Sequence, residues 1–595
     1  MRNALLLACG LGLSIVLHAP PAAARTPLAT GTGGAVATIS EQASRAAMTI
    51  LDQGGNAVDA AVAAAAALGV TDPFSCGIGG GGFMLVYLAR EQRVITIDHR
   101  ETAPASVTSA VFLEHGKPLD FETVVASGAA VGVPGTVRGW HEALQRYGSM
   151  EFRQVLAPAI AVAEKGFQVT EIFHHLTAQN ERKFQLYAPT SALYLRDGKA
   201  LPPGTLVRNP GLARAYREIA AGGVKAFYEG PIARAIVEAV NRPPLAPGAR
   251  ALAGRMSLAD LANYEARIRP PLRSAYRGYE VVGMPLPSSG GATVAEALNI
   301  LEGYELRRMP RVQAEHLYLE ASRLAFADRN AYLADPEYVD APLAGLLSKD
   351  FAAARRKLIG ARAARAVAAG DPYAYQDDPS IPLRPRHARS ARSDTRLQRE
   401  NAHTTHLTVS DKDGNVVSYT FTIESWGGSG IVVPGYGFLL NNELTDFDFG
   451  GPHPNVPEAG KRPRSSMAPT IVLKDGKPAF TIGSPGGATI ITTVLQTIFN
   501  HLDLGMPMDA ALNAPRLSER NGAATSVEPG FPGSAAARAL ERLGHRWEAA
   551  PEEIGAASAL VFHPDGSVTA VSEGRRHGVG TALVQRSGHR GSEAN

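Results

Sequence analysis

The 595-residue chain is 45% hydrophobic and 19% charged, so it can bury a large core and does not have the composition of a disordered protein. Its net charge is only +3 and its basic residues are scattered, so composition gives no reason to expect nucleic-acid binding. Of its two cysteines, Cys9 lies near the N-terminus and Cys76 near Gly77. We expect Cys76 to be a small packed residue.

Residues 1–24 have the pattern of a signal peptide. An early Arg2 precedes an apolar stretch over Ala4–Val16, and Ala22–Ala24 provide small residues for cleavage, so the mature protein is expected to start at Arg25. A lipoprotein signal ending at Cys9 is the weaker alternative, because the apolar stretch before it is too short. No later segment offers the ~20 apolar residues of a membrane span. Export without a cysteine pair predicts a bacterial periplasmic or secreted protein.

Helical periodicity dominates the first part of the chain, and strand-like alternation dominates the part after residue 404. Asn56 and Asp59 have the spacing of a capping box at the start of the second expected helix. The expected helices are Glu41–Asp52, Ala57–Leu68, Val137–Arg146, Phe152–Glu164, Ala292–Leu301 and Ala314–Leu333, and early strands are expected at Phe83–Leu88 and Val94–Asp98. This distribution predicts a layered protein of helices and sheets.

A glycine run matches the dinucleotide-binding pattern G-x-G-x-x-G at Gly77, Gly79 and Gly82. That pattern requires a strand before it and a helix after it, whereas here Thr71-Asp72-Pro73 precedes and a strand follows. We therefore expect close backbone packing and no nucleotide cofactor. Neither HExxH nor CxxC occurs, so no metal site is indicated.

An arginine-rich segment containing Pro and Ser lies just before residue 404; its arginines are Arg384, Arg386, Arg389, Arg392, Arg396 and Arg399. An anionic partner is one interpretation. A mobile solvated segment over residues 379–403 is favoured, and such mobility would let a newly cut end swing away.

Thr404 and Thr405 begin a stretch in which a threonine can act as a nucleophile. If the chain is cut before Thr404, its α-amino group, with a pKa of about 7.7–8.0, can take the proton from its own hydroxyl. Thr-rich alternation alone is typical of a half-buried strand. The stretches 404–410 and 415–423 read as a hairpin with a two-residue turn at Asp413-Gly414, which places Thr404 opposite Ile423 and beside Thr422 and Glu424 unless a bulge shifts the register.

Several motifs in this order resemble the γ-glutamyltranspeptidase family over nearly all of the mature chain. They are GGNAVDAAVAAAAALGV, GIGGGGFML, DHRETAPA at 98–105, HTTHLTVSDKDGNVVSYTFTIE, NNELTDF at 441–447, KRPRSSMAPTIV at 461–472 and GSPGGATIITTVLQ at 483–496. The resemblance implies an α+β fold, the four-layer αββα sandwich of N-terminal-nucleophile hydrolases. It also implies a precursor cut between His403 and Thr404 into a large subunit, 25–403, and a small subunit, 404–595, which form a heterodimer.

The resemblance implies that Thr404 is the nucleophile and that Thr422 hydrogen-bonds it. Gly486 and Gly487 lie between a strand and a helix, where unpaired N–H groups are available, and match the family glycines of the oxyanion hole. Asn441 lies near these motifs, and its role is left open.

The substrate-binding residues that the resemblance implies carry both charge signs. Arg100 matches the arginine that forks onto the α-carboxylate of a γ-glutamyl group. Ser465 and Ser466 match a serine pair that binds the same carboxylate, and Asp446 matches the acid that holds the α-ammonium. Glu443 and Glu424 stand where some members carry Gln and Asn. Taken singly, each has an ordinary structural explanation as a surface ion pair, turn or loop residue.

These residues predict an enzyme that cleaves γ-glutamyl amides such as glutathione through a γ-glutamyl ester, which water or the amine of an amino acid or peptide then resolves. One alternative is an acylase of the same superfamily that removes a glutaryl group, which has no α-ammonium. Another is a non-catalytic, unprocessed binding protein.

Only nineteen positions separate Asp446 from Ser465, so the chain resembles family members that lack a lid over the site. A loop over 447–464 of this length can line an entrance but is too short to fold across it. Phe447 and Phe449 are candidates for a partial cover.

Overall fold

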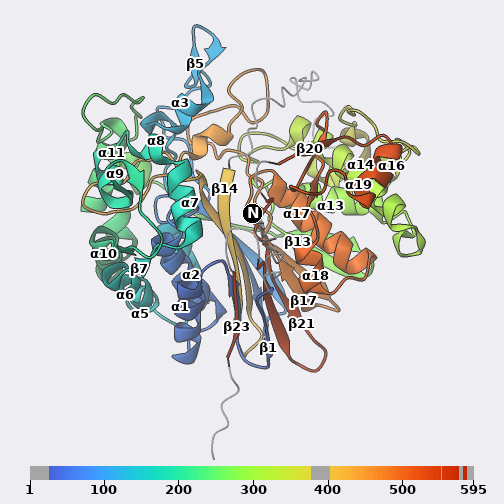
Figure 1. The fold of residues 1–595 in the computed structure, drawn as a ribbon, viewed down its shortest axis with the longest axis horizontal. Helices are drawn as coiled ribbons and strands as arrows, with labels where there is room; N and C mark the ends of the chain where they lie inside the picture. The colour runs from blue at the N-terminus through green and yellow to red at the C-terminus, as the bar shows by residue number, and fades with distance from the viewer. Residues whose placement is uncertain (1–25, 377–401, 551–552, 575–579, 586–595) are drawn as a thin grey trace, which may run out of the picture.

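The computed structural model describes residues 26–376, 402–550, 553–574 and 580–585, with only the backbone of residues 402 and 403. The expected signal peptide and most of the arginine-rich segment therefore lie outside the described residues. Two seven-stranded sheets lie face to face in the middle of the molecule, and helices cover the outer face of each (Figure 1). This arrangement confirms the predicted four-layer αββα sandwich.

One sheet, which we call the β14 sheet, carries the expected nucleophile. Its strands, in spatial order, are β11 (Arg267–Arg269), β4 (Arg93–Asp98), β3 (Gly81–Leu88), β15 (Val416–Ser425), β14 (Ala402–Ser410), β2 (Ala35–Thr38) and β23 (Thr581–Val584). The other, the β17 sheet, has the order β1 (Leu28–Gly31), β22 (Val568–Ser572), β21 (Ser558–Phe562), β17 (Lys477–Ile482), β16 (Thr470–Lys474), β13 (Tyr279–Gly283) and β12 (Leu272–Tyr276). Neighbouring strands in both sheets run antiparallel wherever their register is defined.

The helical layers come from different parts of the chain. The layer on the β14 sheet contains α1 (Glu41–Asp52), α2 (Ala57–Thr71), α4 (Thr136–Tyr147), α5 (Phe152–Val155), α6 (Ala157–Lys165), α10 (Pro210–Tyr228) and α11 (Pro231–Asn241). The layer on the β17 sheet contains α13 (Gly290–Leu301), α14 (Arg311–Tyr332), α16 (Lys349–Arg356), α17 (Thr489–Ile498), α18 (Met508–Asn513) and α19 (Ala535–Arg542). Within the described residues, no helix is both long and apolar enough to cross a bilayer.

Shorter elements lie around this sandwich. They are β5 (Leu113–Glu114), β6 (Lys117–Pro118), α3 (Phe121–Val125), β7 (Phe167–Gln168), α7 (Glu171–Gln179), α8 (Glu181–Phe184), α9 (Ala188–Tyr194), β8 (Leu195–Arg196), β9 (Lys199–Ala200), β10 (Leu206–Val207), α12 (Leu258–Ala262), α15 (Leu343–Leu346), β18 (Leu517–Ser518), β19 (Thr525–Val527) and β20 (Trp547–Ala549).

The local sequence explains several helix boundaries. Asn56 and Asp59 form the predicted capping box of α2, in which the Asn56 side chain accepts from the Asp59 backbone N–H and the Asp59 carboxylate accepts from the Asn56 backbone N–H. The single helix predicted over 152–164 is wrong, because Leu156 separates α5 from α6. Pro158 has no N–H to donate to the carbonyl of Gln154, so the helical hydrogen-bond pattern is interrupted there.

The β14–β15 hairpin forms with a register one residue away from the prediction. Its loop has three residues, 412–414: the Asp411 N–H donates to the Asn415 carbonyl (3.1 Å), and Gly414, with φ of +85°, donates to the Asp411 carbonyl (3.2 Å). Such a loop is a turn followed by a left-handed residue, which only glycine adopts at little cost. The predicted two-residue turn is therefore wrong, and Thr404 lies opposite Thr422.

The glycine run before β3 lets backbones approach closely, as predicted. A Cβ on Gly79 would come within 2.0 Å of the Leu439 carbonyl oxygen, and one on Gly80 within 1.9 Å of that of Thr422. The run therefore packs against the end of β15, the strand that carries Thr422. Cys76, one residue before it, is buried as expected.

Candidate active site

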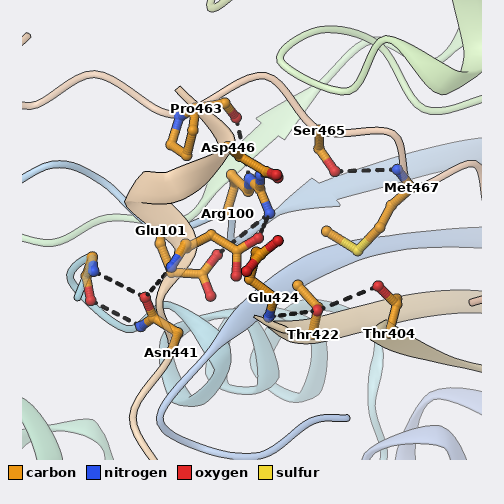
Figure 2. Close-up of polar contacts among 12 residues, drawn as sticks. Arg100, Glu101, Thr404, Thr422, Glu424, Asn441, Asp446, Pro463, Ser465 and Met467 are labelled. Carbon is orange, nitrogen blue, oxygen red and sulfur yellow. Dashed lines mark hydrogen bonds and ion pairs between the residues drawn. The ribbon is translucent and has the colours of Figure 1, made fainter. Parts of the chain in front are cut away.

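The end of β14 places Thr404 in the interior of the sandwich. Thr404 is only 5% exposed, and its hydroxyl donates to the Thr422 hydroxyl on the adjacent strand at 3.3 Å (Figure 2). The Thr422 hydroxyl also accepts from the backbone N–H of Glu424 at 2.8 Å. Pairing of the two threonines across the hairpin therefore fixes the direction of the expected nucleophile. A bulge separates Ala402 from Thr404, so the regular ladder is interrupted at the peptide bond that is expected to be cut.

Glu424 ends β15 in a backbone conformation that a side chain rarely adopts. Its φ is +78°, and its carboxylate accepts hydrogen bonds from Ser425 Oγ (2.5 Å), Thr445 Oγ1 (3.2 Å) and the Asn442 amide. Strain of this kind persists where surrounding contacts hold it and is concentrated at functional sites. Burial raises the pKa of Glu424 to about 7.

Arg100 lies at the centre of a cluster of acids. It follows β4 and is 1% exposed; its two terminal nitrogens form ion pairs with Glu443 and Asp446, and its Nε–H donates to the Pro463 carbonyl at 3.2 Å (Figure 2). Glu443 and Asp446 belong to one short helical turn, Glu443–Asp446. Burial alone would lower the pKa of Arg100, and the charges of these acids more than offset that effect.

The acids around Arg100 outnumber it. The Glu101 carboxylate lies 3.9 Å from an Arg100 nitrogen, and burial raises the pKa of Glu101 to about 8 and that of Glu443 well above its usual range. Asp446 is the acid that reaches solvent, with 30% of its side chain exposed. Burial thus favours the neutral forms of Glu101 and Glu443, and the solvent-reaching carboxylate of Asp446 is the one best placed to meet an incoming cation.

The serine pair approaches this cluster from the segment after Arg464. Ser465 is buried and its hydroxyl accepts from the Met467 N–H at 3.1 Å, whereas half-buried Ser466 accepts from an Arg329 nitrogen at 2.7 Å. Figure 2 shows Ser465 across from Asp446 and Arg100, above the strand ends that carry Thr404 and Thr422. Arg100, Glu443, Asp446 and Glu424 therefore gather with Ser465 around one place, and Ser466 adjoins that place in sequence.

The predicted oxyanion glycines form the turn between β17 and α17. Gly486 has φ of +127° and Gly487 of +56°, and their carbonyls accept from the N–H groups of Thr489 and Ile490. Among the described residues, neither glycine N–H donates a hydrogen bond. A Cβ on Gly483, at the end of β17, would come within 2.2 Å of the ring of His406 on β14. Gly483 therefore packs against the strand that carries Thr404, and Gly486 follows three residues later in the chain.

The structure gives a role to Asn441, which the sequence left open, and adds Glu101 and Arg329 to the residues that support the site. Asn441 has a clear structural role: its side chain donates to the carbonyls of Gly79 (2.7 Å) and Gly132 (2.9 Å) and accepts from the Glu443 N–H (3.0 Å). Glu101 could have been found, since it directly follows Arg100. Arg329 lies in a long buried helix, where no local pattern marks it.

Phe447 and Phe449 lie in an apolar cluster. Both are 3% exposed and pack with Phe112 of the arm that precedes β5; the Phe112 and Phe449 ring centroids are 4.4 Å apart. The apolar cluster accounts for the burial of both rings, and their suggested use as a partial cover stays a prediction. In the described parts of the chain, no group of three or more His, Cys, Asp or Glu side chains is arranged to hold a metal ion.

A four-layer sandwich with a threonine at the start of a central strand is the architecture of the N-terminal-nucleophile hydrolases. The family model of gamma-glutamyltranspeptidase matches residues 43–583, and the chain belongs to that family. The chain is 38% identical over 561 residues to a glutathione hydrolase proenzyme of Bacillus subtilis, with 93% of this chain and 92% of the relative covered.

Acylases are also among the similar proteins. An acylase ACY 1 proenzyme of a Pseudomonas species is 37% identical over 566 residues, covering 93% of this chain and 94% of the relative. The crystal structure of a cephalosporin acylase from Bacillus halodurans superimposes with a TM-score of 0.83 at 29% identity, covering 97% of this chain and all of that one. Proteins named glutathione hydrolases and proteins named acylases are thus both similar to this chain. The charges of the site are what distinguish the two activities.

Proposed function

We propose that the protein is an autoprocessed γ-glutamyltransferase and glutathione hydrolase. The chain is cut between His403 and Thr404 into a large subunit, residues 25–403, and a small subunit, residues 404–595, which stay together. The freed α-amine of Thr404 accepts the hydroxyl proton as Oγ1 attacks the γ-amide, the donor amine leaves, and a γ-glutamyl ester remains. Water or the amine of an amino acid or peptide then attacks that ester.

The observation that carries the proposal is the internal ion pair between Arg100 and the acids Glu443 and Asp446. The α-carbon end of a γ-glutamyl group carries one carboxylate and one ammonium. If the carboxylate takes the place of an acid on Arg100 and the ammonium pairs with Asp446, the donor replaces a buried ion pair with two matched ones. No buried charge is then left without a partner.

A glutaryl donor fits the same cluster less well. Its carboxylate could pair with Arg100, but it has no ammonium for the acids that are displaced. Leaving a buried charge unpaired is strongly destabilising, at about 3–5 kcal/mol. The charges therefore favour γ-glutamyl donors over the glutaryl donors of the acylase alternative.

The remaining groups have complementary roles in the proposal. Thr422 holds the Thr404 hydroxyl, the undonated N–H groups of Gly486 and Gly487 stabilise the oxyanion, and Ser465 with Ser466 binds the α-carboxylate. Glu424 and Glu443 help Asp446 by offering carboxyl oxygens that accept hydrogen bonds from the ammonium. We also propose export to the periplasm or beyond, on the signal-peptide pattern of residues 1–24.

The experiment compares γ-glutamyl-p-nitroanilide with glutaryl-p-nitroanilide as donors for the wild type and for Asp446→Asn. We expect wild-type kcat/KM to be at least tenfold higher for the γ-glutamyl donor. Asp446→Asn keeps the shape of the side chain and removes its charge, so it should lower kcat/KM for the γ-glutamyl donor roughly tenfold or more, which is about 1.4 kcal/mol per factor of ten.

The same substitution should leave the glutaryl donor unaffected or improve it, because an unpaired acid is removed. If the ratio of kcat/KM for the two donors is the same in Asp446→Asn as in the wild type, the ammonium is held elsewhere. Preference of the wild type for the glutaryl donor would identify an acylase. A release of p-nitroaniline that rises on adding a dipeptide acceptor would show transfer in addition to hydrolysis.

A further inference from the structure

Arg329 lies behind the serine pair, on the buried face of α14. It is 2% exposed, and its guanidinium donates to Ser289 Oγ (2.9 Å), Asn330 Oδ1 (2.8 Å) and Ser466 Oγ (2.7 Å). All three partners are neutral side chains. Among the described residues, no carboxylate lies within 4 Å of this guanidinium, so a buried cation is held here without an ion pair.

The contact with Arg329 determines whether the Ser466 hydroxyl oxygen accepts or donates in that hydrogen bond. A guanidinium can only donate, so the Ser466 oxygen must accept from it and the hydroxyl hydrogen must point elsewhere. Ser465 is in the same position, because its oxygen accepts from the Met467 N–H. Within the described residues, neither hydroxyl donates to a protein acceptor. Both O–H groups are thus available to donate, and each can serve an acceptor oxygen of an anion.

The charges support the same conclusion. Glu443 and Asp446 already neutralise Arg100, so the positive potential of Arg100 towards an incoming anion is reduced. The cation behind Ser466 is not neutralised in this way. An unpaired buried cation one hydroxyl away from the site favours an anion there, and hydrogen bonds to charged groups are the stronger kind.

We propose that Arg329 is a positioning residue for donor recognition: it holds Ser466 so that the serine hydroxyl donates to the α-carboxylate of the γ-glutamyl group, and its charge strengthens that bond. This rests on the proposed function, since it assigns a further residue to the donor site. Arg329 does not touch the donor and takes no part in the chemical step. It acts on the donor through Ser466, which makes its effect specific for donors that carry the α-carboxylate.

The test is a double-mutant cycle with two donors. The variants are Arg329→Lys, Ser466→Ala and both together; the donors are γ-glutamyl-p-nitroanilide and 4-aminobutyryl-p-nitroanilide, which lacks only the α-carboxylate. We expect each single variant to lower kcat/KM for the γ-glutamyl donor roughly tenfold, mainly through KM, and the double variant to be no worse than the worse single one. For the 4-aminobutyryl donor, all three should stay within about twofold of wild type.

Arg323→Lys is the matched control. Arg323 lies on the same helix, is 4% exposed and pairs with Glu519 at 2.7 Å, away from the serines. A purely structural role of Arg329 would lower activity on both donors alike, add to the effect of Ser466→Ala and resemble Arg323→Lys. Each of these results would overturn the proposal.

Two further measurements replace the first ones if a variant does not fold or a donor reacts too slowly. If Arg329→Lys does not fold, Ser289→Ala loosens the same guanidinium from its other side and should show the same dependence on donor. If the 4-aminobutyryl donor is turned over too slowly, inhibition constants of glutamate and 4-aminobutyrate replace it, and only that of glutamate should rise. Wild-type protein that is inactive on the γ-glutamyl donor would instead contradict the proposed function itself.

Discussion

At the scale of single residues, Thr404 combines two properties that are rarely found together. Its hydroxyl is held by Thr422 at 3.3 Å inside the sandwich, and its backbone lies beside a bulge that interrupts the strand ladder. Burial of the hydroxyl favours attack on a nearby carbonyl, because water is excluded. The carbonyl expected to be attacked is that of His403, which immediately precedes Thr404 in the chain.

Replacement of this residue tests the cleavage directly. Thr404→Ala should give a single uncut and inactive chain, because no hydroxyl remains to attack the preceding peptide bond. The wild type, 62.6 kDa before processing, should give bands of about 40 and about 20 kDa on a denaturing gel. Thr404→Ser keeps a hydroxyl and should still be cut. Normal processing of Thr404→Ala would show that another residue is the nucleophile.

At the scale of elements, the turn from β17 to α17 positions the expected oxyanion donors. Gly486 needs its positive φ, and a Cβ there would come within 2.4 Å of Thr489 Oγ1. Gly486→Ala should therefore tilt the N–H groups of the turn away from the oxyanion and lower kcat about 10²-fold or more, with a small change in KM.

Gly505→Ala is the control for this substitution. Gly505 has φ of +67°, and a Cβ there meets nothing within 4 Å, so it adds the strain of a left-handed alanine without touching the site. Its kcat should equal that of the wild type. Equal losses in both variants would mean that Gly486 matters for stability and not for the oxyanion.

The loop between Asp446 and Ser465 decides how open the site is. It folds back on itself, since the Asn455 side chain donates to the Asp446 carbonyl (2.7 Å) and accepts from the Arg464 N–H (2.8 Å), and Phe447 and Phe449 pack with Phe112 in an apolar cluster. We expect a γ-linked oligoglutamate to be turned over at a rate within about tenfold of that for glutathione. Chromatography of the released glutamate measures both. Strict rejection of the longer donor would show that another segment closes the site.

At the scale of the whole molecule, the two sheets meet through polar side chains near the site. Thr408 and Thr481 are joined at 2.8 Å across the interface, and His406 is bonded through Nδ1 to Thr420 at 2.8 Å, while its ring lies against Gly483. Burial lowers the pKa of His406 to about 3. The histidine is thus neutral in the folded protein.

This burial makes the fold sensitive to acid. The unfolded chain takes up a proton at His406 below its ordinary pKa of about 6.5, whereas the folded protein does so only near 3, so stability falls as the pH drops between these values. At pH 5 the loss is about 2 kcal/mol. The melting temperatures of the wild type and His406→Asn, measured from pH 7.5 to 5, should therefore converge as the pH falls. A difference in melting temperature that stays constant from pH 7.5 to 5 would refute this account.

The sequence by itself determined the layered architecture, several helices of the sandwich and the identity of the expected nucleophile. These depend on periodicity, on caps such as Asn56 with Asp59, and on motifs that are continuous in the chain. The local sequence also contains the signal for the helix break, since Pro158 has no backbone N–H, but the predicted helix over 152–164 ignores it. The hairpin register could not be read, because a three-residue and a two-residue loop around Gly414 differ by one residue and only the packing of the sheet chooses between them.

Only the tertiary structure decided the electrostatics of the site. Arg100 is far in sequence from Glu443 and Asp446, and nothing local shows that they form an ion-paired cluster in which acids outnumber the arginine. Arg329 joins Ser466 from a helix 137 residues earlier. Hydrogen bonds and buried charges depend on distances of a few ångströms between segments, and these are set by how the four layers pack.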